Sequence, residues 1–252
     1  STRPEDSRTD DAGMRTVAII QARMWSTRLP GKAMLPLAGA PMTQRLIERV
    51  KRAVKLDYIV LAVPNEADSP LPRLARESGI AYYGTSYVDS NDLVGRYLAV
   101  ADCYAADLIV RIPGDNPCVE PSIIDQAIEQ YKQYPHIYFS NTTAPIEYNG
   151  KRFYVDGLGC EVFSRSRLEW LDARTLGCPD WREHPHQYFY DHGVLSHIKA
   201  DLRLDVNTQA DYEFITDIYA ACYQQNPQFT IHDILDYLAT REQHHEHKEV
   251  TT

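Results

Sequence analysis

The sequence lacks the features that mark membrane, secreted and nucleic-acid-binding proteins. No apolar run reaches the roughly 18 residues that a membrane-spanning helix needs, and residues 1–13 are too polar for a signal peptide. The five cysteines form no C-x-x-C pair, so neither a zinc site nor a disulfide framework is indicated. A formal net charge of −9 provides no basic excess for binding DNA or RNA. We therefore expect a cytoplasmic protein that keeps its thiols reduced and binds no nucleic acid polymer.

What the sequence does contain is typical of one soluble globular domain. Of its 252 residues, 44% are apolar and 24% are charged, which is enough apolar material for a sizeable core. We expect a single domain at 15–241. A disordered N-terminal tail at 1–14 and a polar C-terminal tail at 242–252 would flank it.

Short apolar runs alternate with helical patterns through the first half of the chain. The expected strands are at 17–20, 58–63, 80–83 and 108–112. The expected helices are at 41–53, 71–77, 92–106 and 121–131, with a polar loop at 84–91. Such alternation predicts an α/β fold with a mostly parallel sheet, flanked by helices on both faces. Ligands of such folds bind beyond the carboxyl ends of the strands.

The second half of the chain has a more mixed pattern. Strands are expected at 137–140 and 159–163, on either side of a β-hairpin excursion that turns at Asn149-Gly150. Further elements are expected as helices at 165–173, 183–191, 208–223 and 230–240, and as strands at 195–200 and 202–206.

The segment VAIIQARMWSTRLPGK, at 17–32, is the most informative part of the chain. A strand of the kind that is buried on both faces runs into a loop that carries Arg23, Arg28 and Lys32. Pro30 and Gly31 break regular structure and let the backbone approach a ligand, while three cations can neutralise phosphate oxygens. The spacing is not that of a Walker P-loop. We therefore expect a polyphosphate-binding loop; the alternative is a basic surface loop.

A second polar segment, GDNP at 114–117, follows the strand at 108–112. Its position projects Asp115 from a strand end into the same crevice as the basic loop. A carboxylate there suits Mg²⁺, which proteins commonly bind through one or two carboxylates together with substrate phosphates. The alternative is an Asp that caps a turn before Pro117.

Over roughly residues 15–240, these segments resemble nucleotidyltransferases that activate sugars and sugar acids. The similarity is strongest to the cytidylyltransferases related to CMP-Kdo synthetase and to the SpsF-like spore coat polysaccharide group. The resemblance implies a Rossmann-like nucleotidyltransferase (GT-A-like) fold and a homodimer. It implies Mg²⁺-dependent transfer of CMP from CTP to an anionic acceptor, with release of pyrophosphate. The acceptor would be a sugar acid, a phosphorylated polyol or a phosphonate, for polysaccharide or natural-product biosynthesis.

The resemblance also assigns the nucleotide site. Arg23, Lys32 and Asp115 would be catalytic, because cations on the β- and γ-phosphates and a metal ligand stabilise the charge that develops. The stretch at 91–97 resembles the D-D-V-L-G-R-Y of the family, where side chains would bond a pyrimidine edge; the alternative is a helix N-cap followed by a surface arginine. The full nucleotide-binding set is Gln21, Ala22, Arg23, Ser26, Arg28, Lys32, Asn91, Arg96 and Asp115.

A second metal ligand is expected in the segment LRLDVNTQAD, at 202–211. The family often reads V-D-T-P-E-D here, and its first Asp is a metal ligand. Asn207 occupies that position in this chain. Asp205 lies two residues away on the same strand face, so we expect Asp205 to compensate, with Asn207 as the alternative ligand. Asp211 is better explained as an acid in the first turn of a helix.

Two further segments resemble the acceptor site of the family. VDGLGCEVF, at 155–163, is similar to P-D-G-L-D-V-E-V-F, which places Asp156 and Glu161 at the acceptor, although Gly159 replaces a frequently acidic position. The triplet at 182–184 is similar to R-E-H, which places Arg182 and His184 near an anionic acceptor. The alternative for this triplet is a helix with ordinary surface charges. His184 and His186 could also serve as a proton acceptor, although the spacing does not require that role.

Two other functions fit parts of the pattern. A GT-A glycosyltransferase that uses a nucleotide sugar usually holds its metal with a D-x-D motif, whereas this chain has only Asp115-Asn116-Pro117. A non-catalytic nucleotide-binding protein is the third possibility, and the replacement at Asn207 is the best argument for it.

Overall fold

The computed structural model describes residues 13–64, 68–85, 91–135 and 138–249. Most of the tail expected at 1–14, most of the loop expected at 84–91 and the last three residues of the chain therefore lie outside the described residues. Within the described part, no helix combines the length and the apolar character needed to cross a bilayer.

A six-stranded sheet forms the centre of the molecule, in the order β5-β4-β1-β6-β10-β7. β1 (Thr16–Gln21) pairs in parallel with β4 (Tyr58–Pro64) on one side and β6 (Leu108–Ile112) on the other. β5 (Ala81–Thr85) continues the parallel part. β10 (Glu161–Ser164) is antiparallel to both β6 and β7 (Phe139–Ser140). The mostly parallel sheet predicted from the alternating pattern is confirmed.

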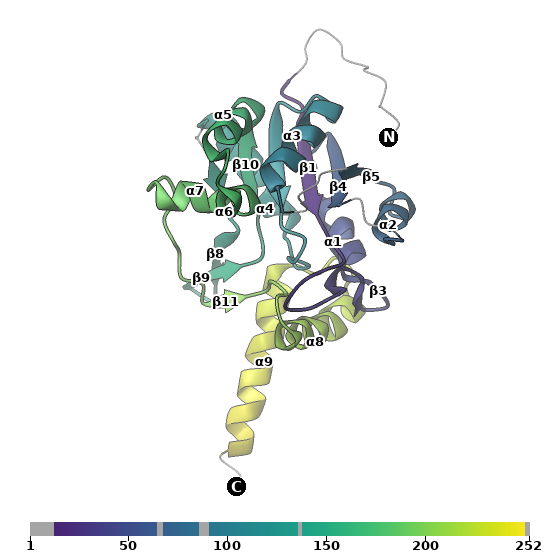
Figure 1. The fold of residues 1–252 in the computed structure, drawn as a ribbon. Helices are drawn as coiled ribbons and strands as arrows, with labels where there is room; N and C mark the ends of the chain where they lie inside the picture. Colours follow the sequence, from purple (N-terminus) through teal and green to yellow (C-terminus); the bar gives the residue numbers. More distant parts are fainter. Residues whose placement is uncertain (1–12, 65–67, 86–90, 136–137, 250–252) are drawn as a thin grey trace.

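Helices cover both faces of this sheet, as the doubly apolar strands require (Figure 1). Alternate residues of β1 enter different cores: Ala18 and Ile20 pack on one face, and Val17 and Ile19 on the other. The first face is covered by α1 (Met42–Val50), α2 (Leu71–Glu77) and α4 (Pro121–Gln133). The second is covered by α3 (Leu93–Tyr104), α5 (Arg165–Thr175) and α7 (Pro185–Asp191), with the short α6 (Pro179–Glu183) beside them.

A third core joins the hairpin excursion to the C-terminal helices. β8 (Thr143–Tyr148) and β9 (Lys151–Asp156) form the predicted hairpin, and Asn149 and Gly150 turn with φ angles of 50° and 70°. β11 (Leu202–Arg203) adds to β9 in parallel. α8 (Gln209–Gln225) packs against this region, and α9 (Ile231–Glu249) extends away from the body (Figure 1). A short 3-10 helix, η1 (Lys32–Met34), and the two-residue strands β2 (Pro36–Leu37) and β3 (Ala40–Pro41) connect β1 to α1.

Four of the expected elements are wrong in detail. The strand expected at 202–206 is only two residues long, Leu202–Arg203. Residues 195–200 form no strand, because the edge of β9 is occupied by Leu202–Arg203, and all four residues at 195–198 line the cleft described below. The helix expected at 183–191 is divided, since Pro185 starts a new helix after His184. The helix expected to end at 240 continues to Glu249, because residues 241–249 contain neither proline nor glycine. The tail expected at 242–252 is thus helical through Glu249.

Candidate active site

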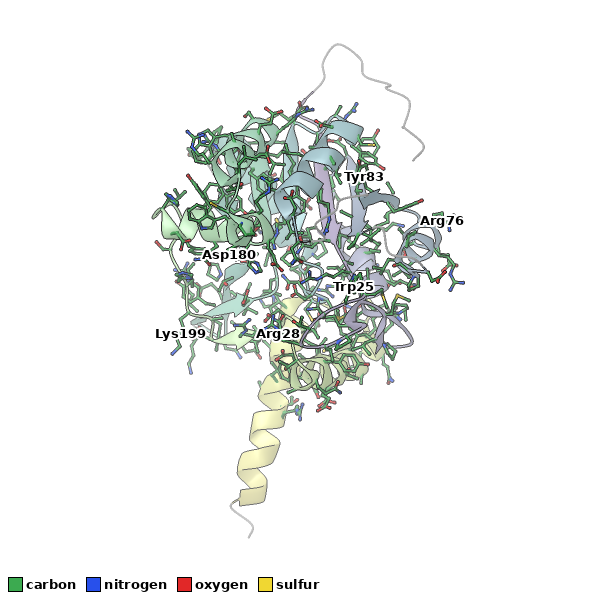
Figure 2. The ribbon with its side chains drawn as sticks, in the orientation of Figure 1. Trp25, Arg28, Arg76, Tyr83, Asp180 and Lys199 are labelled. Atoms are coloured by element: carbon green, nitrogen blue, oxygen red, sulfur yellow. The ribbon has the colours of Figure 1, made fainter. Side chains whose placement is uncertain are left out.

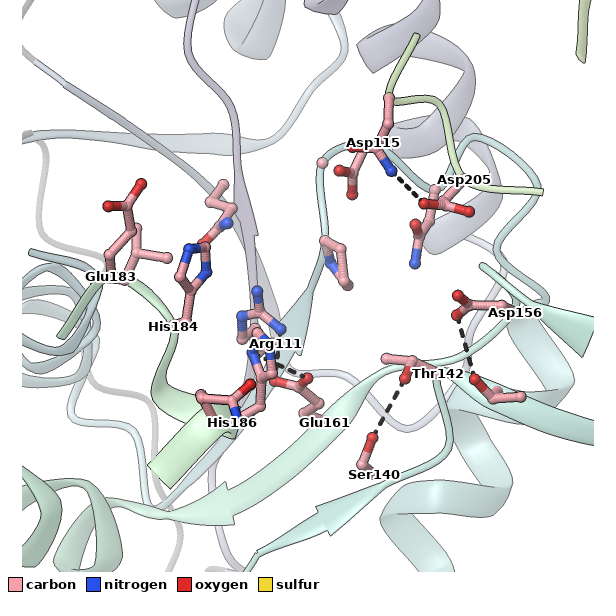
Figure 3. A pocket seen from close by; sticks show the side chains of 18 of the residues that line it. Arg111, Asp115, Ser140, Thr142, Asp156, Glu161, Glu183, His184, His186 and Asp205 are labelled. Atoms are coloured by element: carbon pink, nitrogen blue, oxygen red, sulfur yellow. Dashed lines mark hydrogen bonds and ion pairs between the residues drawn. The ribbon is translucent and has the colours of Figure 1, made fainter. Parts of the chain in front are cut away.

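A cleft of about 640 Å³ opens at the carboxyl ends of β1 and β6, where the α/β pattern predicts a ligand site. Its walls come from the loop after β1, the loop after β6, the α6–α7 segment and residues 195–207. Figure 2 shows Trp25 and Arg28 on the loop after β1, and Figure 3 shows the carboxylates and imidazoles that line the cleft.

A glycine lets the two strand-end loops meet. A Cβ atom at Gly114 would lie 1.9 Å from the backbone oxygen of Gln21, which is far inside van der Waals contact. Any larger residue at this position therefore forces the loop after β6 away from β1. The close approach explains why the GDNP segment and the basic loop line the same cleft.

Two cations of the basic loop reach other segments of the cleft. Arg23 donates from Nη1 to the Oδ1 atom of Asn91 at 2.7 Å, and its Nη2 atom lies 3.6 Å from a carboxylate oxygen of Glu183. Arg28 donates from Nη2 to the Oδ1 atom of Asn207 at 2.7 Å. The loop is thus tied to the α3 side, to α6 and to the segment before α8. Both guanidinium groups lie along the cleft wall.

Lys32 links the basic loop to the strand-end carboxylate. Its Nζ atom lies 3.2 Å from Oδ2 of Asp115 and donates to the backbone oxygen of Val206 at 2.8 Å. The backbone N–H of Val206 donates in turn to the backbone oxygen of Asp115 at 2.8 Å. These contacts join the ends of three segments that are far apart in sequence, and Asp115 lies in the cleft as the position of GDNP predicts.

The two candidates for the second metal ligand lie side by side. Asn207 donates from Nδ2 to the Oδ2 atom of Asp205, while its amide oxygen accepts from Arg28. The carboxylate of Asp205 also pairs with Arg203 at 2.8 Å. Asp211 accepts the backbone N–H groups of Asn207 at 2.9 Å and Thr208 at 2.7 Å, within a capping box at the start of α8. The expectation that Asp211 is a helix-capping acid is therefore confirmed.

The donor set of the cleft suits a magnesium ion. Asp115 and Asp205 both line the cleft and provide hard carboxylate oxygens. Among the described residues, no group of three or more His, Cys, Asp or Glu side chains converges as a metal site. A pair of carboxylates with room for phosphate and water ligands is the arrangement that Mg²⁺ accepts at nucleotides.

A buried ion pair forms the floor of the cleft. Nη1 of Arg111 lies 2.6 Å from Oε2 of Glu161, and the hydroxyl of Tyr138 donates to the same oxygen. Burial alone would raise the pKa of Glu161, but Arg111 and the neighbouring donors outweigh it and hold this pKa below its usual value. Nε of Arg111 donates to the hydroxyl of Tyr97 at 3.0 Å, and that hydroxyl bonds Gln21 at the end of β1. A continuous polar network therefore runs beneath the cleft.

His186 stands beside this network. Its Nδ1 atom is buried and has no hydrogen-bond partner among the described residues, and it lies 3.9 Å from Oε1 of Glu161. Burial lowers the pKa of His186 to about 4, helped by Arg111, His184 and His197, although Glu161 acts in the opposite direction. The imidazole is therefore neutral at physiological pH.

Of the acceptor residues expected on β9 and in the α6–α7 segment, two line the cleft and one does not. Asp156 and His184 line the cleft. Asp156 accepts from the Thr143 hydroxyl at 3.3 Å, and burial and the nearby Asp205 raise its pKa, although Arg203 opposes this. The guanidinium of Arg182 does not line the cleft and pairs with two other carboxylates.

Arg182 has a different setting from the one that the resemblance implied. Its Nε and Nη2 atoms bond both oxygens of Asp92 at 3.0 and 2.8 Å, and its Nη1 atom bonds Asp172 at 2.8 Å. Asp92 also caps α3 by accepting the N–H of Gly95 at 2.9 Å. These contacts fasten α6 to α5 and to the start of α3, since paired and capped carboxylates hold helices in place. The geometry thus favours a structural role for Arg182.

The cleft brings together nearly all of the predicted site. The predicted residues that line it are Gln21, Ala22, Arg23, Ser26, Arg28, Lys32, Asn91, Arg96, Asp115, Asp156, Glu161, His184, Asp205 and Asn207. The sequence interpretation missed Arg111 and named His186 only as an alternative proton acceptor. Arg111 did carry a signal, because an arginine inside the apolar strand LIVRI is buried and requires a charged partner. The place of His186 beside the buried ion pair carried no signal in the sequence.

Comparisons with known proteins agree with this geometry. A family model described as cytidylyltransferase matches residues 17–226. A 3-deoxy-manno-octulosonate cytidylyltransferase from Trichlorobacter lovleyi is 38% identical over 199 residues, covering 72% of this chain and 77% of that protein. The spore coat polysaccharide biosynthesis protein SpsF of Bacillus subtilis is 27% identical over 216 residues, covering 80% of this chain and 85% of that protein.

Solved structures show the same likeness. The structure of a cytidylyltransferase from Leptospira borgpetersenii superposes with a TM-score of 0.75 at 27% identity, covering 92% of this chain and 96% of that chain. The family model spans most of the chain and the whole central sheet. The chain therefore belongs to the cytidylyltransferase family.

Proposed function

We propose that the protein transfers CMP from CTP to a small anionic acceptor in a magnesium-dependent reaction that releases pyrophosphate. The observation that carries the proposal is that the three cations of the basic loop and the strand-end Asp115 line one cleft. Positive charge for a triphosphate and a carboxylate for its metal therefore lie within one site.

The reaction joins an acceptor oxygen to the α-phosphorus of CTP and breaks the bond from that phosphorus to the bridging oxygen of the leaving pyrophosphate. Arg23, Arg28 and Lys32 hold the β- and γ-phosphates and neutralise the charge on the leaving group. Asp115 and Asp205 would hold Mg²⁺, which supplies Lewis-acid polarisation of the α-phosphate. Asn91, just before α3, and Arg96, in the first turn of α3, contact the base.

The acceptor binds in the half of the cleft formed by β8, β9, β10 and the α6–α7 segment. This half presents hydroxyl, imidazole and carboxylate groups from Thr143, Asp156, Glu161 and His184. Groups of this kind suit a substrate with several hydroxyls. The relative from Trichlorobacter lovleyi, named for a sugar acid, and the polysaccharide protein SpsF support acceptors of the sugar-acid class; phosphorylated polyols and phosphonates are the other candidates.

Pyrophosphate release tests the proposal. Each of the four nucleoside triphosphates is assayed with Mg²⁺ and a panel of sugar acids, polyol phosphates and phosphonates. Asp115→Ala is run beside Asp217→Ala, which removes an exposed carboxylate on α8. We expect release from CTP that depends on one acceptor class, is lost in Asp115→Ala and is retained in Asp217→Ala.

The contrary result would be a protein that binds CTP but releases no pyrophosphate with any acceptor. If it instead hydrolysed nucleotide sugars, the glycosyltransferase alternative would replace the proposal. Product analysis by mass spectrometry distinguishes the two reactions, because only cytidylyl transfer yields a CMP-linked acceptor.

A further inference from the structure

A second hollow of about 270 Å³ lies outside the active-site cleft and shares none of its lining residues. It is bounded by α1, by the C-terminal part of α8 and by the loop at 227–229. Arg45, Arg49 and Arg52 project from one side of α1 and the turn that follows it, at a spacing that places them on one helical face. Three arginines therefore converge on one small hollow.

Arg45 already has a full set of acceptors. Its guanidinium donates to the backbone oxygens of Leu37 at 3.0 Å and Ala38 at 2.5 Å, and to the hydroxyl of Tyr223 at 2.6 Å. It also pairs with Glu48 at 2.7 Å. The other carboxylate oxygen of Glu48 accepts from Gln44 at 3.1 Å. Arg45 and Glu48 are thus mutually satisfied and leave no acceptor for a neighbouring cation.

Arg49 is satisfied in a similar way. It donates to the backbone oxygens of Val119 at 2.7 Å and Phe229 at 3.0 Å, and it pairs with Glu120 at 3.2 Å. The oxygen of Glu120 that receives Arg49 also accepts the backbone N–H of Ile231 at 3.1 Å. The three arginines and the two carboxylates, Glu48 and Glu120, leave a net positive charge around the hollow.

Arg52 differs from the other two. Its Nε and Nη2 atoms are buried and have no hydrogen-bond partner among the described residues. Burial lowers the pKa of Arg52, and Arg49 lowers it further, although Glu120 acts in the opposite direction. The Nε and Nη2 groups form the planar edge with which arginine grips two oxygens of one anion. Buried N–H groups without hydrogen-bond acceptors are costly, so this edge favours a partner that brings two acceptor oxygens.

We propose that this hollow is an oxyanion-binding site, in which the Nε and Nη2 groups of Arg52 grip two oxygens of a phosphate group. Arg45 and Arg49 are paired with Glu48 and Glu120, so Arg52 supplies the charge that attracts the anion, and the hollow is large enough for a phosphate. The phosphate is either free inorganic phosphate or the phosphate of a small monoester. The site is separate from the phosphate-binding loop of the cleft and is independent of the proposed reaction.

Arginine Nε–H resonances test the site directly. The ¹H–¹⁵N spectrum of the full-length protein is titrated with inorganic phosphate in a phosphate-free and sulfate-free buffer. The Arg52 resonance is assigned by its loss in Arg52→Gln. The Lys32→Ala background weakens phosphate binding in the cleft, so the remaining response reports the hollow. We expect the Arg52 Nε–H signal to move and saturate in both the native and the Lys32→Ala proteins.

Variants separate this site from general electrostatic attraction. Arg52→Gln removes the positive charge. Arg52→Lys keeps the charge but lacks the planar pair of N–H donors. Arg76→Gln, on the exposed side of α2, is the matched control. In the Lys32→Ala background, both Arg52 variants should bind phosphate at least about tenfold more weakly, as expected for lost charge-assisted hydrogen bonds, and the control should not. A titration with glycerol 3-phosphate distinguishes inorganic phosphate from a phosphate monoester as the ligand. A site for monoesters binds glycerol 3-phosphate more tightly than inorganic phosphate.

Thermal unfolding provides the second measurement. Phosphate should raise the melting temperature of Lys32→Ala, but not that of the Lys32→Ala/Arg52→Gln double variant. The proposal is overturned if the Arg52 Nε–H signal does not respond to phosphate. It is equally overturned if Arg52→Gln and Arg76→Gln reduce phosphate binding alike, since the effect would then be one of overall charge.

Discussion

The ammonium group of Lys32 lies 3.2 Å from Oδ2 of Asp115, although 83 positions separate the two residues in the chain. The pair joins the side of the cleft that suits phosphates to the side that suits a metal. Lys32 also donates to the backbone of Val206, so the same ammonium group positions the segment that carries Asp205. Changes at either member of the pair should therefore alter more than one part of the site.

Asp115→Asn should lower kcat for pyrophosphate release by roughly 100-fold or more, the usual cost of losing one charge-stabilising contact in a dry site. The amide keeps the shape of the side chain and its contact with Lys32 but removes the carboxylate charge. Initial rates at saturating CTP measure the effect, and the melting temperature checks that the fold is intact. An unchanged kcat would mean that Asp115 does not ligate the metal.

Asp205 and Asn207 should respond differently to magnesium. Asp205→Asn should raise the Mg²⁺ concentration needed for half-maximal activity, because one of the two carboxylates is lost. Asn207→Asp should lower that concentration, since it adds a carboxylate beside Asp205. It should also reduce stability without metal, because two carboxylates then repel each other. A magnesium titration of the activity of each variant measures the two changes in magnesium requirement. Thermal unfolding in the absence of metal measures the loss of stability.

The opposite result in these titrations would assign the second metal ligand to Asn207 instead of Asp205. If Asn207→Ala raises the magnesium requirement while Asp205→Asn leaves it unchanged, Asn207 is the second ligand. Arg203→Gln serves as a control, because it removes the partner of Asp205 without changing a carboxylate.

The sequence pattern predicted the parallel part of the sheet. It predicted the elements of the C-terminal half only in part. The strands at 17–20, 58–63 and 108–112 are apolar at every position or nearly so, which only a sheet covered on both faces explains. The segment at 195–200 was expected as a strand, but a strand must pair with a neighbouring strand, and both edges of β9 are occupied, by β11 and β8. Such pairing depends on the tertiary structure, which a local pattern does not reveal.

The sequence predicted those site residues that directly follow the ends of the parallel strands. Asp115 and the basic loop lie where the topology places them, because carboxyl ends of parallel strands meet at one edge. The pairing of Arg182 with Asp92 and Asp172 could not be predicted, because the charge of an arginine does not indicate which carboxylates surround it. The sequence did not show that His186 lies beside Glu161, because the two residues are 25 positions apart and approach each other only in the folded chain (positions 161 and 186).

Arg182→Ala should lower stability more than it affects acceptor binding. The change leaves the carboxylates of Asp92 and Asp172 without their partner, which costs roughly 2–4 kcal/mol for a partly buried, doubly bonded arginine. Chemical denaturation measures the loss, and the KM for the acceptor should stay near that of the native enzyme. His184→Ala is the comparison, with a raised KM and little loss of stability. A raised KM in Arg182→Ala at native stability would instead support contact with the acceptor.

His186 should make the protein less stable in acid. Its pKa is lowered from 6.5 to about 4 in the folded state, so between these values the unfolded chain binds a proton that the folded chain does not. The free energy of unfolding therefore rises with pH across this window, and the stability that His186 contributes is complete above the unfolded value of 6.5 and is lost as pH falls toward 4. This one group adds up to about 1.4 kcal/mol per pH unit to the slope.

The variant His186→Gln isolates that contribution. Glutamine does not titrate, so the slope of unfolding free energy against pH should be shallower than in the native protein between about pH 4 and 6.5, where the histidine alone differs. The groups facing His186, namely Glu161, Arg111, His184 and His197, are present in both proteins. Urea unfolding at half-unit pH intervals provides the two slopes. Parallel curves would show that His186 binds its proton equally in the folded and unfolded chains, and that its imidazole is not held neutral beside the ion pair in the cleft floor.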